Sequence, residues 1–264
     1  MLDPVVVLVD GSRIAREAAA LARRIGAPAR ARVVLVHAVR FAEPVLEADD
    51  VRWEDRVEHG RALLAGEAEA YGAAVDTRVV EGAPADALAA LRPGLVVLGT
   101  RGRGAIRGKL LGSVSREVIR RGTAPTLVVP RAVTEVGVVL AVVEAEPRAV
   151  EVARVASAVA DALRARLVLA TVVRVDPHVA RHPAQYGLEP AIWRDAVQRE
   201  TNLVFAPLRA VAPGEERVCF GLPDVEVRDL AREVGAGIVA VGRGGEAWLA
   251  LSLAARGPFA TLVV

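Results

Sequence analysis

The sequence predicts an α/β protein with two tandem, doubly wound, open parallel sheets. Short runs of apolar, often branched residues alternate with longer stretches of helical periodicity, and this alternation indicates βαβ units. The same order of segments occurs twice in the 264 residues, so we expect one sheet in each half of the chain. Apolar residues make up 53% of the sequence and aromatic residues only 3%, which favours a core of valine, leucine and alanine around buried strands.

The first half contains apolar runs that predict five strands, with amphipathic stretches between them. The strands are expected at residues 5–9, 33–39, 75–80, 95–98 and 126–129, and the helices at residues 14–25, 52–74, 82–91 and 114–121. Right-handed crossovers between such strands give a mainly parallel sheet, and helices then cover both of its faces.

The second half repeats this order after a linker at residues 130–135. The sequence Gly221-Leu-Pro matches Gly82-Ala-Pro, and residues 256–264 match residues 121–129. The strands are expected at residues 137–143, 167–175, 217–220, 238–241 and 260–264, and two of the helices at residues 147–163 and 193–211. A repeat of this length predicts two domains, residues 1–132 and residues 136–264.

A glycine-rich segment follows the fourth predicted strand. Its pattern is Gly-x2-Gly-x9-Gly-Ser, formed by Gly99, Gly102, Gly112 and Ser113. A strand, a glycine-rich loop and a helix start, in this order, allow backbone N–H groups to surround a phosphate, and Ser113 is expected to cap the helix. Basic residues lie within the same segment: Arg101, Arg103, Arg107 and Lys109. The alternative is a surface connection with incidental glycines.

The second half lacks the corresponding loop. The ends of residues 99–122 lie 23 positions apart, whereas the ends of the matching residues 242–257 lie 15 positions apart. Asp10, the acid that ends the first predicted strand, has Glu144 as its nearest counterpart. We therefore expect the second domain to keep the fold and to have lost the phosphate site.

Charge and cysteine content exclude several classes of protein. The formal net charge is +2 with acidic and basic residues interleaved, and aromatic platforms are scarce, which argues against nucleic-acid binding. The single cysteine, Cys219, excludes an internal disulfide and is interpreted as a buried structural thiol. No apolar run approaches the length of a membrane span and no leader pattern precedes residue 5, so we expect a cytoplasmic protein without membrane contact.

Catalytic and metal-binding arrangements are not recognisable in the sequence. His37 lies in an apolar strand and is interpreted as a core histidine, while His178 and His182 lie in a proline-flanked connection interpreted as a surface loop. No catalytic triad and no paired carboxylates accompany the glycine-rich segment. We therefore expect no catalytic residues and no metal-ligating side chains, and binding with at most slow hydrolysis.

These motifs together resemble the universal stress protein family, in its tandem, ATP-binding form. The resemblance rests on Val-Asp10-Gly-Ser, Leu-Val-His37-Ala-Val, Gly82-x-Pro, the glycine pattern and the Thr-Leu-Val-Val-Pro130 sequence. It implies an adenine nucleotide alpha-hydrolase-like fold in which five strands take the order 3-2-1-4-5. Asp10 and the glycine-rich segment then meet at the carboxyl ends of neighbouring strands, where open α/β sheets bind ligands.

The resemblance also implies which residues hold the nucleotide. Asp10 would contact the ribose or the adenine, and Ala38 would contact the adenine through its backbone. The remaining positions serve the phosphates, the first three at the entrance and the other four at the helix start: Gly99, Arg101, Gly102, Gly112, Ser113, Val114 and Ser115.

The expected function is that of an ATP-binding stress-response or regulatory protein, with Mg²⁺ accompanying the nucleotide. The first domain would bind the nucleotide, ADP and AMP remaining open as ligands, and the two domains would pair through residues 126–129 and 260–264 as a pseudo-dimer. Expected partners are adenine nucleotide and either a second copy of the chain or a regulatory protein. The alternative is a nucleotide-free interaction or dimerisation module that acts on a partner protein or a transporter. An adenylyl-transferring or pyrophosphatase-type enzyme ranks third, because no acceptor domain or histidine-rich loop accompanies Asp10.

Overall fold

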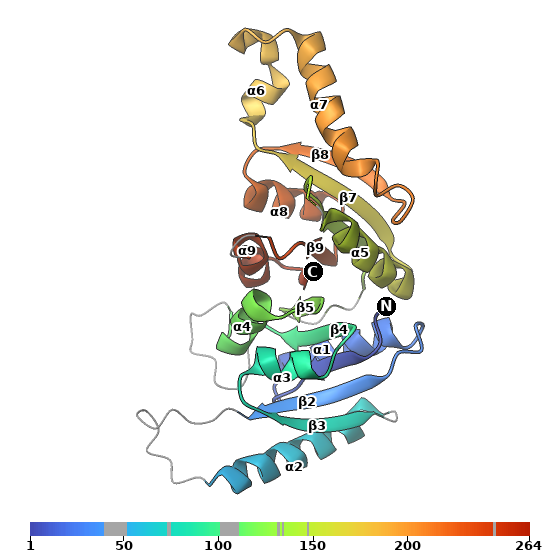
Figure 1. Cartoon of the computed structure of the whole chain (residues 1–264), viewed down its shortest axis with the longest axis vertical. Coiled ribbons are helices and arrows are strands. Elements are labelled where there is room, and N and C mark those ends of the chain that lie inside the picture. Colours follow the sequence, from blue (N-terminus) through green and yellow to red (C-terminus); the bar gives the residue numbers. More distant parts are fainter. Residues whose placement is uncertain are drawn as a thin grey trace. The chain divides into compact units, whose positions relative to one another are not determined.

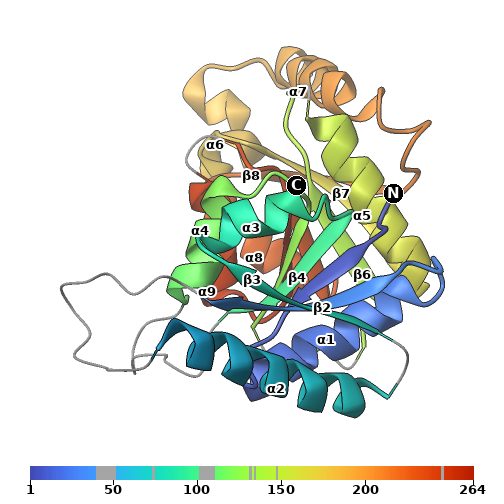
Figure 2. The same cartoon turned by 60° about the horizontal axis from the view of Figure 1, so that its bottom comes forward.

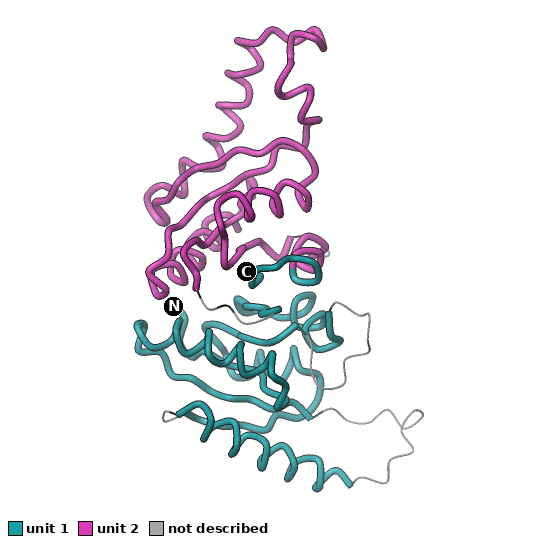
Figure 3. Tube along the Cα trace, turned by 180° about the vertical axis from the view of Figure 1, so that it is seen from behind, with its two compact units in different colours: residues 1–134, 254–261 teal, residues 135–253, 262–264 magenta. Residues whose placement is uncertain are grey.

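The computed structural model divides into two compact units, which are coloured separately in Figure 3. Unit 1 comprises residues 1–134 and 254–261, and unit 2 comprises residues 135–253 and 262–264. The structure describes residues 1–39, 52–72, 75–100, 111–130, 133, 135–146, 148–244 and 247–264.

In unit 1 the strands and helices alternate along the chain (Figure 1). The strands are β1 (Val5–Leu8), β2 (Val33–Val39), β3 (Asp76–Glu81), β4 (Leu95–Gly99) and β5 (Thr126–Val129). The helices are α1 (Arg13–Gly26), α2 (Trp53–Tyr71), α3 (Pro84–Ala90) and α4 (Ser113–Arg121). The strand order is β3-β2-β1-β4-β5 with parallel pairing between neighbours, which confirms the predicted doubly wound sheet and its 3-2-1-4-5 order.

Helices cover both faces of this sheet, as the uninterrupted apolar strands require. Helices α1 and α2 lie below the sheet in Figure 2, and α3 and α4 lie above it. The buried face of α1 is rich in alanine, including Ala15, Ala18 and Ala22, so the helix axis approaches the strands closely. The central strand β1 is buried on both faces, with Val5, Val6 and Val7 each fully inaccessible to solvent.

The second half of the chain repeats the arrangement, with the end of α9 and the start of β10 counted in unit 1. The strands of the second half are β6 (Val138–Val142), β7 (Arg166–Val173), β8 (Glu215–Phe220), β9 (Ile238–Val241) and β10 (Ala260–Val263). The helices are α5 (Ala149–Leu163), α6 (Pro177–Arg181), the 3₁₀-helix η1 (Pro183–Tyr186), α7 (Pro190–Phe205), α8 (Pro223–Glu233) and α9 (Trp248–Arg256). The strand order is β8-β7-β6-β9-β10, equivalent to that of unit 1, and β6 pairs in parallel with both β7 and β9.

The connection between β7 and β8 differs from the sequence prediction. The helix expected at residues 193–211 begins at Pro190 and ends at Phe205, because proline is favoured in the first turn and residues 206–211 form turns. His178 and His182 were expected in a loop, but His178 lies in α6, where the Asp176 carboxylate caps the helix by accepting the His178 N–H at 2.7 Å.

Cys219 was expected to be buried, but it lies in β8, whose residues are intermediate or exposed, and is only half-buried. Burial raises the pKa of its thiol, and the nearby carboxylates of Glu226 and Glu233 raise it further. The side chain therefore stays protonated at neutral pH, which agrees with its interpretation as a structural thiol. Among the described residues, no helix combines the length and the hydropathy needed to cross a lipid bilayer.

Candidate functional site

The carboxyl ends of β1 and β4 lie next to each other in unit 1. The two strands pair in parallel, with Val5 opposite Leu95. Asp10 follows β1 closely and Gly99 is the last residue of β4, so the predicted meeting of these positions at one edge of the sheet is confirmed. The helices that leave the two strands, α1 and α4, lie on opposite faces (Figure 2). This is the topological switch point, where open α/β sheets leave a crevice for ligands.

Asp10 sits in a tight turn between β1 and α1. Gly11 has a φ of 74°, a left-handed conformation that glycine adopts without strain. This turn lets the Ser12 N–H donate to Asp10 Oδ1 at 3.0 Å, while Ser12 Oγ accepts the Ala15 N–H at 3.2 Å and caps α1. The cap of α1 is therefore Ser12, and the Asp10 carboxylate is oriented by the backbone at the end of β1.

Strand β2 fixes the chain just before Asp10. The Val9 N–H donates to the Val36 carbonyl at 2.9 Å, and His37 Nδ1 lies 2.9 Å from the Val9 carbonyl oxygen. His37 is partly buried against Gly60 of α2, where an added Cβ would lie 2.9 Å from the imidazole Cδ2. His37 is thus a packed histidine with a backbone partner, as predicted. Ala38, the next residue of β2, is half-exposed and lies opposite Val80 of β3.

Gly99 is required by packing. A Cβ at this position would lie 2.6 Å from Ile14 Cγ2 and 3.4 Å from the Ile14 carbonyl carbon, so only glycine allows α1 to approach the end of β4. Ser115 of α4 is buried, and its hydroxyl donates to the Gly99 carbonyl at 2.7 Å. The Ser115 side chain therefore ties α4 to β4, and the hydroxyl hydrogen is directed at the backbone instead of a ligand.

The two ends of the glycine-rich segment are joined by the backbone. The Gly112 N–H donates to the Thr100 carbonyl at 2.7 Å, and the Thr100 N–H donates to the Val129 carbonyl of β5 at 3.0 Å. Thr100 is buried and anchors the segment to the sheet. Residues 101–110, including the predicted phosphate contacts Arg101 and Gly102, lie outside the described residues.

The start of α4 differs from the expectation at one position. The N-cap is Gly112, with φ −69° and ψ 161°, and Ser113 is the first helical residue, so the predicted capping by Ser113 is wrong. Among the described residues no side chain caps this helix end, and its first turn holds no acidic residue. The N–H groups of Ser113, Val114 and Ser115 point out of the helix end, where they and the helix dipole favour an anion.

The equivalent edge of unit 2 carries a different set of groups. A cavity of about 210 Å³ lies at the ends of β6 and β9, and its polar lining includes Glu144, Glu146, Arg148 and Arg174. Arg174 pairs with Glu144 at 3.7 Å. Glu146 Oε2 lies 3.8 Å from the position that a Cβ on Gly244 would take. Two carboxylates thus border the place that corresponds to the start of the glycine-rich segment.

Three positions that organise the site in unit 1 were not singled out in the sequence: Val9, Ile14 and Thr100. Their contributions are a backbone carbonyl, a packing methyl group and a pair of backbone hydrogen bonds. Backbone groups leave no signature in residue type, so only the three-dimensional structure identifies Val9 and Thr100. The close spacing of Ile14 and Gly99 is equally a product of how α1 crosses β4. No group of three or more histidine, cysteine, aspartate or glutamate residues suited to a metal ion occurs within the described ranges.

The sequence of this chain is similar to those of known universal stress proteins. The family model described as the Universal stress protein family matches residues 1–130. A universal stress protein of Thermus aquaticus is 34% identical over 140 residues, which cover 49% of this chain and 99% of that protein. A universal stress protein of Methanocaldococcus jannaschii is 28% identical over 138 residues, covering 48% of this chain and 81% of the relative.

Among solved structures, the similarity of fold covers the whole length of this chain. The crystal structure of a universal stress protein from Archaeoglobus fulgidus covers 100% of this chain with a TM-score of 0.67 at 15% identity, and 98% of that structure is matched. The sequence match to the Thermus relative covers about half of the chain, whereas this structural match spans both halves. The chain belongs to the universal stress protein family.

Proposed function

We propose that unit 1 binds ATP at the carboxyl ends of β1 and β4, and that the chain is a nucleotide-dependent regulatory protein of the stress response. The observation that carries this proposal is the helix end of α4, which holds three outward N–H groups without a side-chain cap among the described residues. The Gly112 to Thr100 hydrogen bond fixes this helix end next to the edge where β1 and β4 finish. An anion there gains from both the N–H groups and the helix dipole.

The other end of the nucleotide would lie toward β1 and β2. Asp10 is placed to accept hydrogen bonds from a ribose hydroxyl, since its carboxylate is oriented by the turn at Gly11. The backbone of Ala38, on the neighbouring strand, would contact the adenine edge. Arg101 and Gly102 are proposed at the phosphate entrance on the resemblance alone. The Ser115 hydroxyl is proposed to position Gly99, leaving its N–H for the phosphate.

Mg²⁺ fits this arrangement as a companion of the phosphates. The ion usually keeps several waters and binds through phosphate oxygens, so it needs no complete protein cage. The Asp10 carboxylate, at the end of β1, could accept a hydrogen bond from a water molecule bound to Mg²⁺. The residues argue for binding and positioning of the nucleotide, and we propose hydrolysis that is slow at most.

Unit 2 is proposed as a scaffold that binds no nucleotide at the equivalent edge. We propose this because the connection after β9 lacks the long glycine-rich segment of unit 1, and because Glu144 and Glu146 line the cavity together with Arg148 and Arg174. We further propose that the two domains pair as a pseudo-dimer through β5 and β10. A second copy of the chain or a regulatory protein is proposed to bind differently to the nucleotide-bound and nucleotide-free forms. The protein is proposed to work in the cytoplasm, where its single cysteine remains reduced.

The first experiment is to denature the purified protein and quantify the adenine nucleotide that it releases. One nucleotide per chain is expected, and two per chain would show that unit 2 also binds. If no nucleotide is released, added ATP should raise the melting temperature, because a ligand that binds only the folded state stabilises it. Failure of both tests would favour the nucleotide-free interaction module.

A matched pair of variants tests the helix end. Gly112→Asp and Gly112→Asn both introduce a good N-cap side chain, so both should keep or raise the stability of α4. The aspartate also places a negative charge beside the phosphates, and it should lower ATP affinity by about tenfold or more relative to the asparagine variant. If both variants bind ATP as tightly as the unsubstituted protein, the start of α4 does not hold the phosphates.

A further inference from the structure

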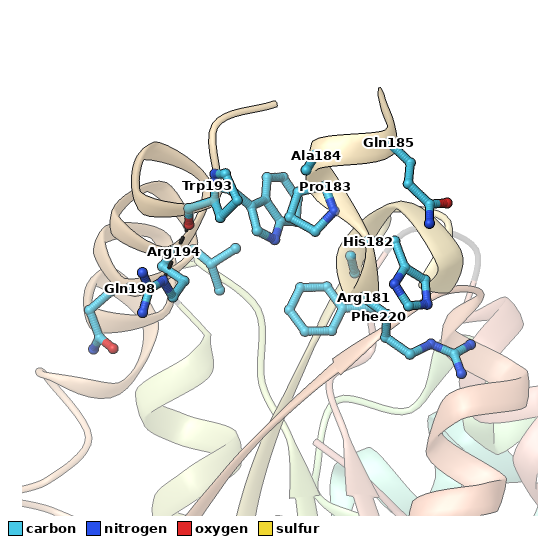
Figure 4. A pocket seen from close by; sticks show the side chains of 12 residues that line it. Arg181, His182, Pro183, Ala184, Gln185, Trp193, Arg194, Gln198 and Phe220 are labelled. Atoms are coloured by element: carbon cyan, nitrogen blue, oxygen red, sulfur yellow. Dashed lines mark hydrogen bonds between the residues drawn. The ribbon is translucent and has the colours of Figure 1, made fainter. Parts of the chain in front are cut away.

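Unit 2 contains a second, larger pocket that no part of the proposed nucleotide site uses. It lies between α6, η1, α7 and the end of β8 and encloses about 720 Å³ (Figure 4). None of its described lining residues lines the cavity at the ends of β6 and β9. Its size is within the range of sites that bind small organic molecules.

Helix α7 forms one wall of the pocket, and only its last part covers the sheet. In unit 1, α2 contacts both β2 and β3, which it crosses. In unit 2, the buried residues of α7 are Thr201, Val204 and Phe205, all in its last two turns. The first half of α7 therefore projects beyond β7 and β8 together with α6, as Figure 1 shows. That projection creates the pocket.

Two aromatic side chains form the apolar centre of the pocket. Trp193 of α7 and Phe220 of β8 have ring centroids 6.4 Å apart at an interplanar angle of 40°. Both residues are only half-buried, so each keeps exposed apolar surface. The sequence contains 3 tryptophans and 4 phenylalanines, and the pocket brings one of each together. A flat apolar molecule would cover this exposed surface and be attracted to the rings by aromatic contacts.

Cationic and amide groups surround this aromatic centre. Figure 4 shows Arg194 and Gln198 on the α7 side, and Arg181 and His182 on the opposite side. The lining residues that the structure describes include no aspartate or glutamate. The pocket is thus positive at its rim and apolar at its centre.

The two arginines are held by the backbone and not by acids. Arg181 Nε donates to the Pro177 carbonyl at 3.0 Å, and Arg194 Nε donates to the Pro190 carbonyl at 3.3 Å. Within the part of the chain that the structure describes, neither guanidinium forms an ion pair. Both arginines are exposed, and a guanidinium can bind a carboxylate through two parallel N–H groups.

We propose that this pocket binds a flat organic anion of the aromatic carboxylate class. The ring system would lie against Trp193 and Phe220, and the carboxylate would accept hydrogen bonds from Arg194, while Arg181 adds positive charge on the opposite rim. A neutral ring compound would gain the stacking alone, and a cation would be repelled by the rim. This proposal is independent of ATP binding by unit 1.

Calorimetric titration of the full-length protein tests the proposal with 2-naphthoate as the probe and 2-naphthamide as its neutral counterpart. One naphthoate should bind per chain, and the amide, which has nearly the same shape, should bind about tenfold more weakly because it loses the charge-assisted hydrogen bonds. Equal affinity for the two probes, or no binding of naphthoate at millimolar concentration, would overturn the proposal.

The chain offers a matched control for the arginine. Arg194→Gln should lower naphthoate affinity about tenfold. Arg199→Gln, five residues further along α7, should leave the affinity unchanged, since Arg199 Nε makes the equivalent bond to the Asp195 carbonyl at 3.3 Å but does not line the pocket. Equal losses in both variants would indicate a nonspecific effect of charge and would contradict the proposed site.

Gly112→Asp separates this site from the one in unit 1. That variant changes the helix end of α4, so it should leave naphthoate binding as it is in the unsubstituted protein. If naphthoate binding falls with Gly112→Asp, the probe occupies unit 1 and the proposed pocket in unit 2 is wrong. If naphthoate binds both the unsubstituted protein and Gly112→Asp while neither of them binds ATP, the proposed pocket in unit 2 is supported and the proposed nucleotide function is wrong.

Discussion

Strands β4 and β9 occupy the same place in the strand order of their units, yet the chain that follows each of them differs. At the end of β4, a Cβ added to Gly99 would lie 2.6 Å from Ile14 Cγ2, and the next helix begins with no side-chain cap among the described residues. After β9, a Cβ added to Gly242 would have its nearest neighbour at 3.6 Å, and two glutamates border the cavity. The sheet tolerates both endings because the core lies in the strands and helices, whereas anion binding depends on the few residues beyond the strand.

The largest expected effect comes from adding one methyl group at each of these glycines. Gly99→Ala should lower the free energy of unfolding by about 1–3 kcal/mol, since the new Cβ would collide with Ile14 and force α1 away from β4. Gly242→Ala should change it by about 1 kcal/mol or less and with the opposite sign, because the nearest atom to the new Cβ would be Val152 Cγ2 at 3.6 Å, an ordinary contact, and the unfolded chain loses conformational freedom. Urea denaturation of the two variants measures both values. Similar losses would mean that the two strand ends are packed alike.

A medium effect is expected at the hydrogen bond that holds α4 against β4. Ser115→Ala removes the hydroxyl that donates to the Gly99 carbonyl at 2.7 Å and should cost about 1 kcal/mol of stability. The same variant should weaken ATP binding less than Gly112→Asp does, because the Ser115 N–H remains. Thermal denaturation with and without ATP gives both numbers. A complete loss of ATP binding with normal stability would instead assign the hydroxyl to the ligand.

The smallest effect is expected at the acidic edge of unit 2. Glu144→Gln breaks an exposed pair with Arg174 at 3.7 Å and should change stability by about 0.5 kcal/mol or less. With Glu146→Gln added, the double variant tests whether charge alone keeps nucleotide out of unit 2. We expect the released nucleotide to stay at one per chain, because the shortened connection after β9 lacks the long glycine-rich segment of unit 1. A rise toward two would show that the carboxylates were the barrier.

The sequence was sufficient for the architecture of both halves. Apolar runs such as residues 95–98 predicted the ends of their strands within about a residue. A strand buried on both faces is a continuous apolar run, so the first and last apolar residues mark where it begins and ends. The crossover between β7 and β8 was predicted less well. Pro190 and the short helices around His178 have local propensities that do not identify where the chain leaves the sheet.

The candidate site was predicted in its location but not in the role of each residue. Glycine spacing and Asp10 pointed to one edge of the sheet, and the parallel pairing of β1 with β4 brings them there. Ser113 was expected to cap α4, yet Gly112 occupies the cap and Ser113 the first turn. Helix ends are set by backbone geometry that shifts by one or two residues without changing the pattern of side chains.

By itself, the sequence determined the βαβ order, its duplication and the place of the glycine-rich segment, because these follow from periodicity and from residue types that the backbone demands. Only the tertiary structure decided that Gly99 serves α1 packing, that Thr100 and Gly112 close the segment, and that Trp193 and Phe220 meet beside two arginines. Each of these depends on residues far apart in the chain or on backbone atoms, and neither distance across a fold nor backbone hydrogen bonding is recorded in the order of side chains.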